Sequence, residues 1–354
     1  MTVARPADIL ALGTATPVGL RSDAVAAAIR GGLHRGRMVK WRNKKSERQR
    51  MSLLADGYLP VLDPALVRLQ RSDAARRMVR LATYALREAC APCTEPPPVL
   101  LALPEERRGA AGIAGPEMVR HIATQAGVKL DERGSRVYRQ GGAGGLYALS
   151  DALGLLASDR YPYVLVGGVD TFFDSRRLAE LDAEDRLSGS SMDGFVPGEG
   201  AAFLLLGLRS LRCRLRLPPL ARVTGVGVGV EKGHRHSPEP YRGDGLAQAF
   251  RALFATLPLA TPKVRCVYAG FNGESLPTKE WGVAHIRNAA RFAEDSSMEH
   301  PAECVGDAGA ALGLLMVALA AMAIRDGYRE EPCLVWSTSD GEARAAAMVE
   351  AAVP

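Results

Sequence analysis

The chain alternates short apolar runs with longer amphipathic or apolar segments over its whole length. In the first half, apolar runs predict buried strands at 8–12, 99–102, 163–166 and 201–206, with helices at 22–30, 72–90 and 146–157. In the second half, the same reading predicts strands at 224–230, 264–268, 333–337 and 345–349, with helices at 245–257 and 308–324. Strands that alternate with helices predict parallel sheets sandwiched between helices.

Two segments allow a second interpretation. Residues 224–230 alternate Gly with Val, which predicts a strand with one face free of side chains, so that another backbone or a ligand can approach it closely. A dinucleotide-binding fingerprint is a weaker alternative, because no helix begins directly after this segment. Residues 308–324 carry no charge over 17 positions, the lower edge of a membrane span. They lack an aromatic belt, so we expect a fully buried helix and no membrane span.

The two halves of the chain echo each other. Each has a Gly-rich stretch that heads an apolar helix, at 141–145 and at 306–309. In each, a strand follows the helix, and an Asp-Gly pair (Asp193-Gly194, Asp340-Gly341) then precedes an Ala-rich strand. This pattern predicts an internal duplication of α/β units, with an N-terminal half at 1–210 and a C-terminal half at 211–354.

Composition and charge place the chain among ordinary globular proteins. It has 354 residues, 47% hydrophobic and 24% charged, which excludes disordered and fibrous classes. The net charge of +6 is a modest surplus and does not indicate nucleic-acid binding. Residues 34–50 hold eight Lys or Arg and one acid, Glu47, which predicts a solvated surface loop. A docking patch for an acidic partner is the alternative.

The cysteines do not form a metal-binding pattern. Six are scattered along the chain: Cys90, Cys93, Cys213, Cys266, Cys304 and Cys333. Cys90 and Cys93 form half of a zinc motif without a second pair, and His234 and His236 have no third ligand near them in sequence. We therefore expect reduced thiols in a cytoplasmic protein, with no metal and no cofactor. The first residues also lack the basic and apolar segments of a signal peptide.

Several motifs occur in an order found in one enzyme family. They are the strand and P-V-G turn at 9–19, Gly145-Leu-Tyr-Ala148, Gly167-Gly-Val-Asp170, Asp193-Gly-Phe-Val-Pro-Gly-Glu-Gly200, 240–246 and Gly309-Ala-Ala311. Together they resemble the β-ketoacyl synthases of the thiolase fold over nearly the whole chain. The stretch from Asp193 to Gly200 is the most specific match.

The resemblance implies an α/β, thiolase-like fold of duplicated α-β-α-β-α halves with mixed five-stranded sheets. It also implies a homodimer, or a heterodimer with a ketosynthase, and an acyl thioester delivered by an acyl carrier protein. Active members of the family use a Cys at the turn that heads the first buried helix, where the helix N-terminus lowers the thiol pKa. Two His, or one His and one Asn, assist from loops of the second half.

The family's reactive positions fall on glycines in this chain. The nucleophile aligns with Gly142, the first His with Gly270 and the second His with Gly306. Because glycine has no side chain to be acylated, we expect no condensing activity and assign no catalytic residue. The resemblance then implies a fatty acid or polyketide type protein that binds an acyl chain or a carrier protein, or that pairs with an active synthase.

Other side chains near these positions suggest alternatives. The candidate pocket residues are Phe195, Asn272, Glu274, Cys304 and Asp307. Glu274 and Asp307 have the chemistry of an acid/base pair, which would suit an acyltransferase or thioester hydrolase of altered mechanism. The competing interpretation is that both acids cap turns or helix starts. Cys304 is either a relocated thiol or a structural residue.

Overall fold

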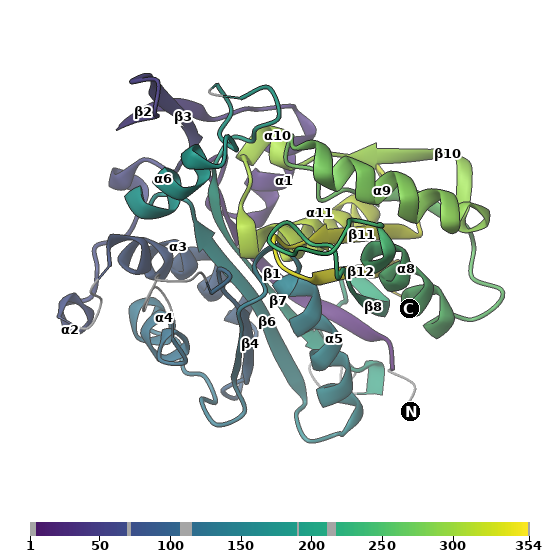
Figure 1. The fold of residues 1–354 in the computed structure, drawn as a ribbon. Coiled ribbons are helices and arrows are strands. Elements are labelled where there is room, and N and C mark those ends of the chain that lie inside the picture. The colour runs from purple at the N-terminus through teal and green to yellow at the C-terminus, as the bar shows by residue number, and fades with distance from the viewer. Residues whose placement is uncertain (1–4, 69–71, 107–114, 190, 211–216, 353–354) are drawn as a thin grey trace.

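The computed structural model describes residues 5–68, 72–106, 115–189, 191–210 and 217–352, so Cys213 lies outside the described residues. Helices and strands alternate along the chain as expected (Figure 1). The helices are α1 (Ser22–Arg30), α2 (Pro64–Val67), α3 (Asp73–Cys90), α4 (Met118–Ala126), α5 (Gly144–Ala157), α6 (Ser175–Ala183), α8 (Asp244–Thr256), α9 (Ser275–Arg287), α10 (Ala302–Val305) and α11 (Leu312–Arg325). The prediction missed α4, α6 and α9, and also the short helices α2 and α10.

Ten of the described strands form one mixed sheet, in which the same five-strand order occurs twice. The first five are β1 (Ala7–Ala15), β4 (Val99–Ala102), β5 (Arg136–Tyr138), β6 (Tyr163–Thr171) and β7 (Glu199–Gly207), in the order β5-β4-β6-β7-β1. The second five are β8 (Ala221–Val230), β9 (Val264–Tyr268), β10 (Phe292–Glu299), β11 (Cys333–Thr338) and β12 (Ala343–Glu350), in the order β10-β9-β11-β12-β8.

Strand directions also repeat between the two sets of five. In the first set, β4 runs parallel to β5 and β6, while β7 is antiparallel to β6 and β1. In the second set, β9 runs parallel to β10 and β11, while β12 is antiparallel to β11 and β8. A short antiparallel pairing of β1 with β8, at Ala7–Ile9, joins the two sets into one sheet.

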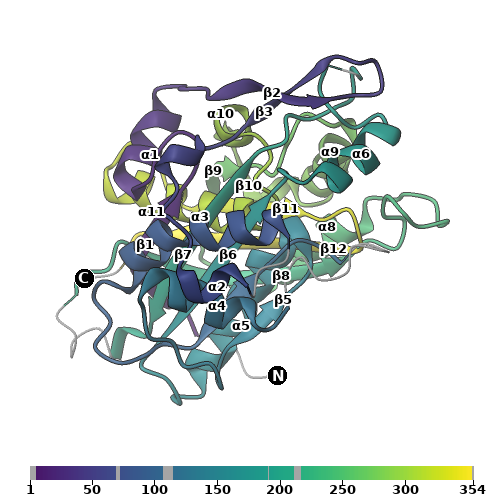
Figure 2. The same cartoon turned by 90° about the vertical axis from the view of Figure 1, so that its left-hand side faces the viewer.

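Helices α5 and α11 lie between the two sets of strands, and other helices cover the outer faces (Figures 1 and 2). Helices α3 and α4 pack on the outside of the first set, and α8 and α9 on the outside of the second. This gives the α-β-α-β-α layering that was expected. Every residue of α11 from Leu312 to Ala323 is buried, and no helix among the described residues is long and apolar enough to cross a membrane.

Glycines in the strands allow backbone to approach backbone, as the Gly-Val pattern predicted. In β8, a β-carbon on Gly227 would lie 2.1 Å from the carbonyl oxygen of Ala249 in α8. The prediction that the strand at 163–166 stops at the following glycines is wrong, because β6 continues to Thr171. Within β6, position 167 has no room for a side chain, because a β-carbon there would lie 2.1 Å from the ring of Phe203.

The basic segment 34–50 is a β-hairpin and not the surface loop that its charge predicted. Strands β2 (Gly36–Arg42) and β3 (Arg48–Ser52) pair antiparallel at the edge of the molecule (Figure 2). Val39 and Met51 turn inward onto a cluster that contains Phe195, while the basic side chains remain exposed. Charge therefore masked a period-two pattern that buries one face of the hairpin.

Candidate functional site

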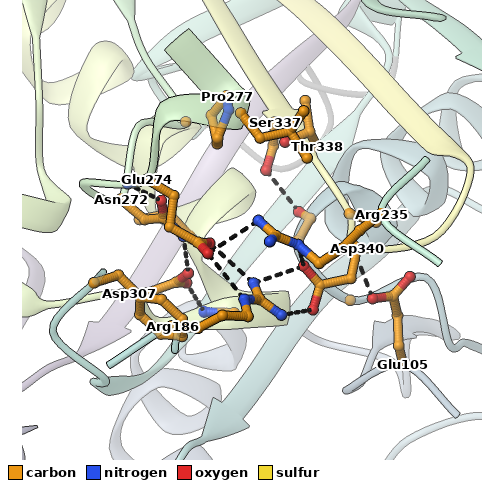
Figure 3. Close-up of a pocket in the computed structure, with 18 of the residues that line it drawn as sticks. Glu105, Arg186, Arg235, Asn272, Glu274, Pro277, Asp307, Ser337, Thr338 and Asp340 are labelled. Atoms are coloured by element: carbon orange, nitrogen blue, oxygen red, sulfur yellow. Dashed lines mark hydrogen bonds and ion pairs between the residues drawn. The ribbon is translucent and has the colours of Figure 1, made fainter. Parts of the chain in front are cut away.

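A cavity of about 70 Å³ lies where the N-terminal ends of the two central helices meet (Figure 3). The turn Gly141–Ala143 leads into α5, the turn Gly309–Ala311 leads into α11, and both turns contribute to the wall. Four of the predicted pocket residues line this cavity: Phe195, Asn272, Glu274 and Asp307. Cys304 does not; it lines a separate cavity.

Gly142 lies against the end of β11. The Ser337 hydroxyl donates a hydrogen bond to the carbonyl oxygen of Gly142 at 2.9 Å. Ser339 Oγ accepts one from the backbone N–H of Ala143 at 3.0 Å and donates to the carbonyl oxygen of Gln140. A β-carbon on Gly142 would lie 2.4 Å from the carbonyl oxygen of Thr338. The space beside Gly142 is therefore filled by backbone of the second half.

The other two glycines of interest lie in different places. Gly270 follows β9 and lines the same cavity as Gly142; a β-carbon there would lie 2.9 Å from the carbonyl oxygen of Trp336. Gly306 has φ +71° and lines the separate cavity with Cys304, although the next residue, Asp307, lines the central one. Two of the three glycines thus share one cavity.

Asn272 connects the two predicted carboxylates. Its Nδ2 donates to Glu274 Oε2 at 3.1 Å and to Asp307 Oδ2 at 2.9 Å. Asp307 Oδ1 also accepts from the backbone N–H of Gly309 at 2.8 Å, so it caps the turn before α11. Burial raises the pKa of Asp307, and the hydrogen bonds from Asn272 and Gly309 offset part of that rise.

Glu274 is held by two guanidinium groups. Arg186 donates from Nε and Nη2 to its two oxygens at 2.8 and 2.9 Å, and Arg235 Nη2 donates to Oε1 at 2.9 Å. Arg186 also forms a two-point pair with Asp340, at 2.8 Å for both contacts. Burial alone would lower the pKa of Arg186, but Glu274 and Asp340 raise it. Glu274, Asp340 and the two arginines therefore form a closed network of ion pairs (Figure 3).

A second buried ion pair supports the turn after β11. Arg344 and Glu280 are each 1% exposed, and Arg344 Nη2 donates to Glu280 Oε1 at 2.6 Å. Arg344 Nη1 donates to the carbonyl oxygens of Ser339, Gly341 and Ala343. Burial raises the pKa of Glu280, and the pair with Arg344 opposes that rise. Within the described chain, Glu280 Oε2 has no hydrogen-bond partner.

Acids of two of the family-like motifs, Asp170 and Glu199, also hold the scaffold. Asp170 binds Arg177 at 2.6 Å and accepts from the backbone N–H of Ala310, in the turn before the second central helix, at 3.0 Å. Glu199 is fully buried and binds Arg77 through Nε at 2.5 Å and Nη2 at 2.7 Å. Asp170 therefore links the first half to the second, whereas Glu199 holds α3 against β7 within the first half.

The sequence did not point to several members of the site. Arg186, Arg235, Asp340 and Glu105 come from loops far apart in the chain, and no local spacing connects them. Glu105 accepts from the backbone N–H groups of Asp340 at 3.2 Å and Gly341 at 3.0 Å. Among the described residues that line the cavity there is neither a cysteine nor a histidine. Its chemistry is that of paired carboxylates, guanidinium groups and hydroxyls.

No family model matches the sequence, but solved structures match the fold. A ketosynthase from module 6 of the bacillaene synthase from Bacillus subtilis 168 superposes with a TM-score of 0.80 at 14% identity, covering 99% of this chain and 72% of that chain. The ishigamide ketosynthase/chain length factor superposes with a TM-score of 0.79 at 14% identity, covering 99% of this chain and 100% of that chain. A ketosynthase from module 1 of the bacillaene synthase from Bacillus amyloliquefaciens FZB42 superposes with a TM-score of 0.76 at 15% identity. The match covers 98% of this chain and 76% of that chain.

These likenesses extend over almost the entire described chain. At such identities they show the fold alone. The chain has the α/β, thiolase-like fold of ketosynthases, which confirms the fold class expected from the motifs.

Proposed function

We propose that this protein is a non-condensing member of the ketosynthase fold that pairs with an active ketosynthase in fatty acid or polyketide type synthesis. The observation that carries the proposal is the contact at Gly142. A nucleophile at this helix start would need a β-carbon, and the carbonyl oxygen of Thr338 lies 2.4 Å from where that atom would be. Glycine here fits a chain that contributes structure to a synthase and not the covalent step.

The size of the cavity favours a partner subunit over a protein that holds an acyl chain there. Small-molecule pockets commonly measure about 300–1,000 Å³, whereas the central cavity measures about 70 Å³. Because one buried water needs about 10–15 Å³ of cavity volume, the central cavity has room for a few waters. The likeness to a solved protein described as a ketosynthase/chain length factor agrees with this preference.

The experiment has two arms. After incubation with acyl thioesters on a carrier protein, intact-mass spectrometry should detect no acyl adduct on the chain. Co-expression with an active ketosynthase should give a complex that elutes together and condenses faster than the ketosynthase alone. A stoichiometric acyl adduct on Cys304 or Cys266, or condensation by this chain alone, would contradict the proposal. A self-associated homodimer that leaves the ketosynthase unaffected would contradict the pairing.

The hairpin β2–β3 is where we propose that an acyl carrier protein docks. Its exposed basic side chains include Lys40 and Arg48, and attraction to an acidic carrier is strongest at low salt. The K40E and R48E variants should weaken co-purification of an acidic carrier protein. R251E, on the exposed face of α8, is the control and should not. Equal retention of the carrier by all three variants would exclude docking at the hairpin.

The second candidate function is an acyltransferase or thioester hydrolase of altered mechanism. What favours it is that Asn272 bridges Glu274 and Asp307 in one cavity and that burial raises the pKa of Asp307, as a general acid requires. Against it, Glu274 is occupied by Arg186 and Arg235. Thioester cleavage by wild type, E274Q and D307N at equal rates would eliminate this function.

A further inference from the structure

Two cysteines, Cys90 and Cys93, lie together where α3 ends. We propose that they form a redox-active dithiol, which a low-molecular-weight disulfide such as oxidised glutathione converts into a disulfide between Cys90 and Cys93. The inference does not rest on the proposed function, because neither cysteine lines the central cavity or belongs to the basic hairpin.

The backbone turn holds the two residues within the range that a disulfide requires. Helix α3 ends at Cys90, and the backbone N–H of Cys93 donates to the carbonyl oxygen of Cys90 at 3.0 Å. A four-residue turn of this kind places its first and last α-carbons less than about 7 Å apart, and disulfides span about 4.4–6.8 Å between α-carbons. Pro92 fixes a backbone torsion inside the turn, which limits the conformations that would separate the thiols.

The two thiols also contact each other. The Cys90 thiol donates a hydrogen bond to the Cys93 sulfur, which raises the pKa of Cys90 and lowers the pKa of Cys93. Burial raises the pKa of Cys90 as well, since this residue is only 8% exposed, whereas Cys93 is partly exposed. Cys93 is therefore the thiol that ionises and meets a reagent, and Cys90 is held behind it.

Oxidation then takes two thiol–disulfide exchanges. The Cys93 thiolate attacks one sulfur of oxidised glutathione, so that a Cys93–glutathione disulfide forms and one glutathione thiolate leaves. Cys90 next loses its proton to solvent, and its sulfur attacks Cys93 Sγ and expels the second glutathione thiolate. The two cysteines lose two electrons and two protons in all, and oxidised glutathione gains them as two thiols.

The segments on both sides of the pair are anchored. After it, the Tyr163 hydroxyl at the start of β6 accepts from the backbone N–H groups of Thr94 at 3.1 Å and Glu95 at 2.6 Å. Before it, Glu88 accepts from the Ser22 hydroxyl at 2.9 Å. Two reacting groups that are held close together react much faster than free ones, so the second exchange should outpace the first.

A metal site is the competing interpretation of two cysteines with this spacing. A structural zinc ion needs four ligands. Among the residues that the structure describes, no group of three or more His, Cys, Asp or Glu side chains could hold a metal ion. The pair therefore suits the exchange of electrons better than the binding of a metal.

A second pair of thiols provides an internal control. Cys266 and Cys333 lie opposite each other on the neighbouring parallel strands β9 and β11, and both are 0% exposed. Because a disulfide reagent cannot reach them in the folded protein, they should stay reduced under conditions that oxidise the pair at the end of α3.

Oxidation of the full chain by glutathione tests the proposal. The protein is incubated in mixtures of oxidised and reduced glutathione, quenched with acid and alkylated with N-ethylmaleimide. Both cysteines fall in one tryptic peptide, 88–107. As oxidised glutathione increases, this peptide should lose both alkyl groups together and become about 2 Da lighter than its dithiol form. A peptide that keeps both alkyl groups in excess oxidised glutathione would overturn the proposal, as would faster oxidation of Cys266 and Cys333.

Single substitutions separate the two roles. C90S and C90A should both stop at a stable glutathione adduct on Cys93, which should not accumulate in the wild type. C93S should form an adduct at Cys90 at least about tenfold more slowly, because that thiol is buried. C304S is the control, and its 88–107 peptide should oxidise as in the wild type. Equal accumulation of the Cys93 adduct in C90S and the wild type would show two independent thiols and no dithiol.

Discussion

Ser337 donates a hydrogen bond from its hydroxyl to the carbonyl oxygen of Gly142, at 2.9 Å. The two residues are 195 positions apart, one at the end of β11 and the other in the turn before α5. The contact fastens the start of the first central helix to the second half of the sheet. It also brings the carbonyl oxygen of the next residue, Thr338, against Gly142.

A side chain at Gly142 should therefore destabilise the protein. The substitution G142A places a β-carbon 2.4 Å from the Thr338 carbonyl oxygen, and overpacking of this kind typically costs about 1–3 kcal/mol. G154A, in the helix α5 that follows this turn, is the matched control, because a β-carbon there meets no atom within 4 Å. It should be neutral or stabilising by up to about 1 kcal/mol. Urea unfolding of both variants is the measurement, and equal midpoints would show that the turn relaxes freely.

A cysteine placed at this position, where the resemblance puts the ketosynthase nucleophile, should not produce condensation. G142C meets the same carbonyl oxygen, and the cavity around it has lining residues with neither cysteine nor histidine in the described chain. We expect no acyl adduct by intact-mass spectrometry and no condensed product from acyl and malonyl thioesters. Product formed by G142C but not by the wild type would mean that glycine at this one position is what blocks the reaction.

The hydroxyl of Ser339 should contribute more to the stability of the fold than the hydroxyl of an exposed serine does. Its hydroxyl accepts from the Ala143 N–H and donates to the Gln140 carbonyl oxygen, so S339A leaves buried backbone groups unpaired. Leaving a buried group without its hydrogen bond costs about 1–3 kcal/mol. S158A removes the hydroxyl of an exposed serine after the same helix and should stay within about 0.5 kcal/mol. Comparison of their urea midpoints tests the difference; similar values would show that water replaces the Ser339 hydroxyl.

The sequence predicted the layered fold because the signals for it are local. Apolar runs identified most strands, Gly-Val alternation identified the bare face of β8, and the uncharged stretch identified α11. The hairpin β2–β3 was missed because its inward residues are separated by basic ones. Helix α9 was missed because its apolar residues show little helical periodicity and because it contains Pro277.

The central cavity was only partly predictable, because its members come together through tertiary structure. The family pattern directed attention to Gly142, Gly270 and Asp307, which all line it. Nothing in the sequence around Arg186 or Asp340 shows that these two residues, 154 positions apart, form a two-point ion pair. Such contacts depend on how loops from the two halves meet, and a spacing rule along the chain carries no information about that.

Arg186 should be the residue whose removal from the cavity costs most. R186M leaves the buried carboxylate of Glu274 and the partly exposed carboxylate of Asp340 with fewer partners, and breaking a buried ion pair on one side typically costs about 3–5 kcal/mol. R287M breaks the exposed pair with Asp244 and should cost at most about 1 kcal/mol. Adding E274Q and D340N to R186M should recover part of the loss. A triple variant no more stable than R186M would show that the loss comes from packing and not from the uncompensated charges.

Glu280 should make the stability of the protein depend on pH. Burial raises its pKa in the folded state, so between its ordinary value and the folded value the folded protein binds more protons than the unfolded chain. Under that condition the free energy of unfolding falls as pH rises.

E280Q removes the titrating group but keeps an oxygen to accept from Arg344. Relative to the wild type, E280Q should therefore gain stability as pH rises from about 4.5 towards neutrality. Urea unfolding at several pH values across this range measures the gain, with E132Q, at an exposed glutamate, as the control. A difference between E280Q and the wild type that stays constant or shrinks with rising pH would show that the pair with Arg344 outweighs burial.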